Sequence, residues 1–136
     1  MQQENYYLKT QRNSIMQLRI NAAQDHLDHG RFKQAGSTLK DIICDQEKLI
    51  ADGVWNISRG NTELSVTHFM MAEVMFALSN YRLAVYHSNK SYKLCAVLFG
   101  TENSLTVRKK ERMEEYKQVL INSFLESISH KTAPTA

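Results

Sequence analysis

The sequence predicts an all-α protein built from antiparallel helical hairpins that stack side by side. Helix breakers are scarce, because the only proline is Pro134 and the chain has five glycines. Apolar residues recur at helical spacing through most of the chain. In addition, two stretches read alike, HGRFKQA at 29–35 and LSNYRLA at 78–84. Together these observations predict about five helices, no strand and one domain over residues 1–130.

The first hairpin is expected at about residues 6–51. Apolar residues at helical spacing run from Tyr6 to His29, Gly30 supplies the left-handed residue that ends a helix, and the pattern restarts at Arg31. Residues 53–61, GVWNISRGN, contain two glycines and are expected to form the internal loop. Asn61 or Thr62 is then expected to cap the next helix.

The second hairpin is expected at about residues 62–99. Asn80 is placed to cap its second helix, and Gly100 to end it. A last helix follows at about 102–129. Residues 131–136 are small and polar, so we expect a disordered tail.

The two hairpins look like copies of one unit. When the like stretches are superposed, small residues fall on small ones and aromatic residues on aromatic ones. Alanine lets two helices approach closely, and an aromatic residue after the turn covers the end of the hairpin core. One hairpin cannot bury its own apolar face, so copies are expected to stack. The matched pairs are Ala23 with Ala72, Leu27 with Phe76, Gly30 with Ser79, Phe32 with Tyr81, Ala35 with Ala84 and Leu49 with Leu98.

This pattern resembles the tetratricopeptide repeat. That family has a small residue midway along its first helix, Gly-x-Tyr at the turn and Ala early in its second helix. Residues 16–49 and 65–98 follow it, but Arg19 and His68 hold the tryptophan position and no proline ends either unit. The copies also lie further apart than the family period of about 34 residues. Longer units ending in LFGTENSLTV are similar to the repeats of kinesin light chains and some MYND-finger proteins.

The resemblance implies a groove, lined by the first helix of each unit, that holds a partner peptide. Methionine and aromatic side chains there would suit an apolar helix or strand. Ile20 and Gln24 occupy two places of the basic clamp that some members use for a carboxy-terminal carboxylate, so chaperone-tail binding is not expected. The groove positions are Gln17, Ile20, Gln24, Leu27 and Asp28 in the first unit, and Val66, Phe69, Glu73, Phe76 and Ala77 in the second.

The last helix offers a second candidate surface. Arg108 and Arg112 could dock an acidic partner with Tyr116, or they could belong to a solvated charged face. The apolar arc of this helix is wider than one contact face needs, so it either packs on two sides, forms a partner or dimer surface, or is a well-buried capping helix. The arc comprises Leu105, Met113, Tyr116, Val119, Leu120, Ile121, Phe124, Leu125 and Ile128.

Composition argues against several other classes of function. A net charge of +3 is small for a nucleic-acid-binding domain, and no apolar run is long enough to span a membrane. Cys44 and Cys95 have no metal spacing, so we expect free thiols in core positions and a reducing, cytoplasmic location. His26 and His29 could form half a metal site, but a solvated helix end is the preferred interpretation. We expect no metal, no cofactor and, without a catalytic motif, no enzyme activity.

The sequence therefore predicts a non-catalytic adaptor or scaffold domain that binds another protein or a peptide. Two alternatives remain open. The chain could be a helical regulatory segment of a larger enzyme, such as a MYND-type methyltransferase, or a helical bundle that forms a homodimer through its last helix.

Overall fold

The chain folds into an array of helices in which each helix packs against its neighbours in sequence. The computed structural model describes the backbone of residues 2–132 and the side chains of residue 11 and of residues 13–129. Within these residues there are five helices and no strand, as the sequence predicted. They are α1 (Gln2–Asp28), α2 (Phe32–Ala51), α3 (Ile57–Ala77), α4 (Tyr81–Phe99) and α5 (Ser104–Thr132).

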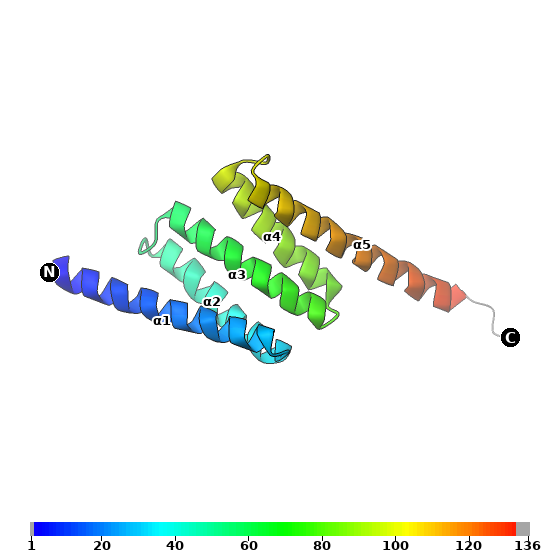
Figure 1. The fold of residues 1–136 in the computed structure, drawn as a ribbon, viewed down its shortest axis with the longest axis horizontal. Coiled ribbons are helices and arrows are strands. Elements are labelled where there is room, and N and C mark those ends of the chain that lie inside the picture. The colour runs from blue at the N-terminus through cyan, green and yellow to red at the C-terminus, as the bar shows by residue number, and fades with distance from the viewer. Residues whose placement is uncertain (1, 133–136) are drawn as a thin grey trace.

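Figure 1 shows α3 in the middle of this array, with α1 and α2 on one side and α4 and α5 on the other. The amino-terminal part of α1 and the carboxy-terminal part of α5 extend past the packed helices in opposite directions. Besides its sequence neighbours, α3 also contacts α1. Because α3 lies in the middle of the array, the exposed surfaces of the array depend on which faces of α3 the other helices leave uncovered.

The two hairpin turns have the same backbone structure. Two residues after the end of each first helix, Gly30 with φ +72° follows α1 and Ser79 with φ +62° follows α3, both in the left-handed region. In each turn this residue donates its N–H to the carbonyl three residues back, at 3.2 and 3.0 Å. The N–H of the next residue, Arg31 or Asn80, bonds the carbonyl five residues back at 2.8 Å. These paired bonds satisfy the last carbonyls of each helix, so the like stretches fold alike despite the serine in the second.

The alanines that the two units share are fully buried in the cores between the helices. Ala23, Ala35, Ala72 and Ala84 each have 0% exposed surface. The prediction that these four positions lie inside helix–helix contacts is therefore confirmed. Whether the units belong to the tetratricopeptide family is a separate question that burial alone does not decide.

The connection between α2 and α3 is shorter than predicted. α3 begins at Ile57, and Asn56 caps it by accepting a 2.8 Å hydrogen bond from the N–H of Arg59. The expected loop at 53–61 and the expected caps Asn61 and Thr62 were wrong. Gly60 lies inside α3. A Cβ there would come within 2.3 Å of Ile50 Cγ1, so this glycine allows close helix packing.

The single tryptophan joins this connection to the core. Trp55 is 3% exposed, and its indole N–H donates to the Asn13 side chain of α1 at 3.3 Å. Its burial fixes the connection between α2 and α3 against α1. The main core comprises Met16, Ala23, Ala35, Leu39, Ile42, Ile43, Trp55, Leu64, Met70, Met71 and Val74.

The helix ends differ slightly from the predicted ones. α1 begins four residues before Tyr6, and α5 continues to Thr132, so two residues assigned to the tail are helical. The rest of the predicted disordered tail, residues 133–136, lies outside the described residues.

Candidate partner-binding surfaces

The predicted groove residues of α3 lie along one side of that helix. Val66, Phe69, Glu73 and Phe76 are spaced three or four residues apart, which places them above one another. Val66 is 49% exposed, and the other three are half-buried. We call the surface that these residues form with α1 and α5 the α1–α3–α5 surface.

Two aromatic contacts join α3 to α5 on this surface. The Lys109 ammonium lies 3.3 Å from the centre of the Phe69 ring, close enough for a cation–π interaction. The rings of Phe76 and Tyr116 stack with their centres 4.6 Å apart. The two candidate surfaces that the sequence treated separately therefore adjoin each other at these contacts.

Charged groups surround the middle of the surface. Burial raises the pKa of Glu73, although the positive charges of Arg112 and Lys109 oppose the shift. Burial likewise lowers the pKa of Lys109. The negative charge of Asp28 on α1 also acts on Glu73, which shows that side chains from α1, α3 and α5 are in electrostatic reach of one another.

The α1 side of the surface is polar and exposed. Gln24 donates to the Asp28 carboxylate at 2.8 Å, and Gln17 donates to the Asn21 side chain at 3.0 Å. Both bonds join residues four apart on α1, so these side chains line up along the helix. The predicted contacts Gln17, Gln24 and Asp28 are accessible to a partner.

Of the three binding residues predicted on the last helix, two are exposed and one is buried. Arg108 and Arg112 are exposed, and Arg112 forms an ion pair with Glu115 at 3.3 Å. Tyr116, however, is 5% exposed and belongs to a small core with Ala72 and Ala84. The Tyr116 ring packs against Phe76 beneath the surface, so a partner cannot contact it.

The distal part of α5 exposes its apolar residues. Met113 and Tyr116 are buried, whereas Val119 and Leu120 are half-buried. Of the alternatives left open for this helix, the well-buried capping helix does not hold, because α5 continues past the helix that covers it (Figure 1). The exposed apolar residues beyond this point are Ile121, Phe124, Leu125 and Ile128.

A second concave feature lies on the other side of α3, between α2 and α4. It has a volume of about 620 Å³ and is lined by residues of all three helices. We call it the α2–α3–α4 groove. Its lining residues are Lys33, Gly36, Ser37, Lys40, Ile43, Cys44, Met71, Met75, Leu78, Leu83 and His87.

Sequence reasoning missed this groove. Met71 and Met75 are not among the groove positions that the family resemblance implies. Helical spacing from Phe69 places both methionines on the opposite side of α3, and that spacing was the signal available in the sequence. A smaller cleft of about 330 Å³ lies between α1 and α2, and the Arg19–Asp45 ion pair crosses it.

A pair of histidines connects α3 and α4 beside the groove. His68 Nδ1 and His87 Nδ1 are 2.9 Å apart, so one ring donates its proton to the other. Burial, together with the charges of His87 and Lys90, lowers the pKa of His68 to about 4. The pKa of His87 is also lowered, by burial and by Lys90.

The two cysteines have different environments. Cys95 is 2% exposed and lies 3.0 Å from Ser65 Oγ, within a buried polar network between α3 and α4. Cys44 is exposed on α2 and lines the α2–α3–α4 groove, so its predicted core position was wrong. Both thiols are free.

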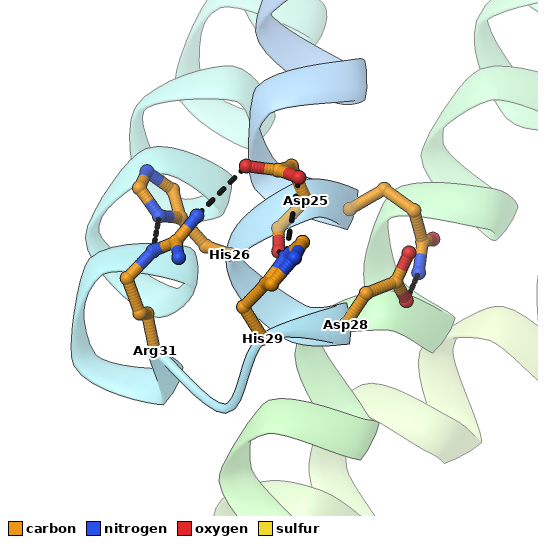
Figure 2. A network of polar contacts seen from close by, with 6 residues as sticks. Asp25, His26, Asp28, His29 and Arg31 are labelled. Carbon is orange, nitrogen blue, oxygen red and sulfur yellow. Dashed lines mark hydrogen bonds and ion pairs between the residues drawn. The ribbon is translucent and has the colours of Figure 1, made fainter.

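The turn after α1 is held by a polar network rather than arranged around an ion. Figure 2 shows Arg31 reaching back over the turn to the carboxylate of Asp25 at 2.7 Å and to Nδ1 of His26 at 2.8 Å. His29 lies 3.2 Å from the same carboxylate. Among the residues that the structure describes, no three His, Cys, Asp or Glu side chains group as metal ligands.

Comparison with known proteins finds no match among protein-family models, curated proteins or solved structures. In the described part of the chain, no helix combines the length and apolar character needed to cross a membrane.

The histidine pair predicts a loss of stability in mild acid. Below pH 6.5 the unfolded chain protonates His68, whereas the folded protein does so only near pH 4. The free energy of unfolding should therefore fall as the pH is lowered from 6.5 to 4, by roughly 1–3 kcal/mol from His68. His68→Gln keeps a polar side chain but removes the titration, so its unfolding free energy should depend less steeply on pH. Urea unfolding followed by Trp55 fluorescence measures this. Parallel pH profiles for the two proteins would contradict the prediction.

Proposed function

We propose that this chain is a non-catalytic, tetratricopeptide-like interaction domain. It binds a protein or peptide partner on the α1–α3–α5 surface and acts as an adaptor or scaffold. Support for the repeat comes from the two turns with the same hydrogen bonds and from the four buried alanines at matching positions. Arrays of helical hairpins commonly provide extended binding surfaces.

The observation that carries this proposal is the row of α3 residues on the α1–α3–α5 surface. Val66 is 49% exposed, although it lies on the central helix of the array. Phe69 is half-buried beneath Lys109, which a partner carboxylate could draw away from the ring. Arg108 and Arg112 lie at the α5 edge of the surface, and Gln17, Gln24 and Asp28 lie at the α1 edge. An apolar centre with a polar and charged rim is the usual composition of a protein interface.

The proposal includes a cytoplasmic location and a protein rather than a nucleic-acid partner. Two free thiols suit a reducing compartment. The net charge of +3 is small, which favours a partner recognised by shape and apolar contacts over a nucleic acid recognised by a strongly positive protein surface.

Affinity enrichment with quantitative mass spectrometry tests the α1–α3–α5 surface. Val66→Glu places a charge on an exposed apolar residue of the α3 row and should reduce capture of the true partner at least about tenfold. Phe69→Ala should have the same effect, with helicity checked by circular dichroism.

The matched control is Val97→Glu, because Val97 is 78% exposed on α4 and lies outside the surface. A partner retained by this variant and lost by the other two supports the proposal. If every captured protein binds Val66→Glu and Phe69→Ala as well as it binds the wild type, the proposal is wrong.

A second candidate function is self-association through α5. Ile121, Phe124, Leu125 and Ile128 are 42–64% exposed and spaced as one helical stripe, the arrangement that a helix–helix dimer buries. Sedimentation velocity over a range of concentrations tests it. A dimer that Phe124→Lys dissociates would support this function, and a monomer at every concentration would exclude it.

A further inference from the structure

The floor of the α2–α3–α4 groove is apolar and deformable. Met71, Met75 and Leu78 follow one another along α3 at intervals of four and three residues. Met71 is 5% exposed, Met75 is half-buried and Leu78 is 38% exposed, so the floor rises towards solvent at the end of α3. Methionine side chains adapt to the shape of an apolar partner, and they are frequent at surfaces that bind helices.

The two walls of the groove differ. Gly36 on α2 is buried, and a Cβ at this position would stand 3.5 Å from the Met75 methyl group, so α2 lies close against α3 at this point. Leu83 of α4 is 40% exposed on the opposite wall. The groove therefore offers apolar contacts from its α4 side and from below.

The rim of the groove is positive. Lys33 and Lys40 of α2 are exposed, and no Asp or Glu is among the lining residues. The next residue along this face of α2 is Glu47, one turn beyond the lining, where the basic rim ends. Neither α2 nor α4 has an acidic residue in its first turn, so no carboxylate there offsets the partial positive charge of the helix amino terminus.

The length of the groove fits a short helix. From Lys33 to Cys44 the lining spans three turns of α2, or about 16 Å at the helical rise. Its volume of about 620 Å³ is within the range of specific binding clefts. Three apolar floor residues at helical spacing match a partner helix with apolar residues at positions i, i+3 or i+4, and i+7.

We propose that the α2–α3–α4 groove docks an acidic amphipathic helix of another protein. The apolar stripe of that helix lies on Met71, Met75 and Leu78, and its carboxylates face Lys33 and Lys40. A second copy of this chain would dock with the exposed apolar stripe of its α5 helix. That helix has only one carboxylate, Glu126, among residues 117–129, so it does not complement the positive rim. This site lies on the opposite side of α3 from the α1–α3–α5 surface and is independent of the proposed function.

Selection of peptides displayed on phage, with the full chain as bait, tests the proposal. The library contains random 12-residue peptides. Enriched sequences should carry a net negative charge and apolar residues at helical spacing. A synthetic peptide of the most enriched sequence, labelled with fluorescein, then gives a dissociation constant by fluorescence anisotropy.

The variant Lys33→Glu/Lys40→Glu reverses the rim charge and should weaken binding of that peptide at least about tenfold. The matched control is Lys110→Glu/Lys117→Glu, which changes the net charge equally on exposed positions of α5 and should leave binding unchanged. Leu83→Ser, a change at an exposed apolar wall residue, should also weaken binding, with helicity checked by circular dichroism.

Three results would overturn the proposal. The selection could enrich no peptide, or it could enrich basic or neutral sequences. The enriched peptide could bind the Lys33→Glu/Lys40→Glu variant as well as it binds the wild type. Finally, the free protein could sediment as a dimer that this variant dissociates, in which case the groove is an interface between two copies.

Discussion

Close packing of helices at small residues is the constraint on which the rest of this structure depends. Ala23, Ala35, Ala72 and Ala84 have no exposed surface, and Gly60 lets the Ile50 side chain fill the space of its missing Cβ. Where side chains are this small, backbones approach closely and many weak contacts form per residue. Because the helices pack chiefly against their sequence neighbours, both sides of the central helix α3 keep exposed residues that neighbouring helices do not cover.

The two hairpins reach close packing by different chemistry. The first has large buried side chains, Leu39 and Ile42, together with Gln46, whose buried amide atoms have no hydrogen-bond partner among the residues that the structure describes. At the matching positions of the second stand Ser88, Ser91 and Cys95. Ser91 donates to the Ser65 carbonyl at 2.8 Å, and Thr106 of α5 donates to the Cys95 carbonyl at 3.3 Å. The second hairpin therefore combines a smaller apolar core with hydrogen bonds between helices.

The sequence predicted the architecture well because helix periodicity and the shared alanines are local signals. It predicted that Ala72 and Ala84 would be buried from a pattern alone. It misplaced the start of α3, because Gly60 reads as a loop residue unless the neighbouring Ile50 side chain is known. The burial of Tyr116 and the exposure of Cys44 depend on which helix covers which face. Helical spacing separates Met71 and Met75 from Phe69, but the α2–α3–α4 groove itself could not be predicted, because it exists only between helices.

Replacement of one shared alanine tests the packing account most directly. Ala72→Leu inserts a larger side chain where α3 meets its neighbours, whereas Ala77→Leu makes the same change at an exposed position of the same helix. The measurement is the free energy of unfolding in urea, followed by Trp55 fluorescence and circular dichroism. The account predicts a loss of about 1–3 kcal/mol or more for Ala72→Leu and a change within about 0.5 kcal/mol for Ala77→Leu. Equal stability of the two variants would contradict it.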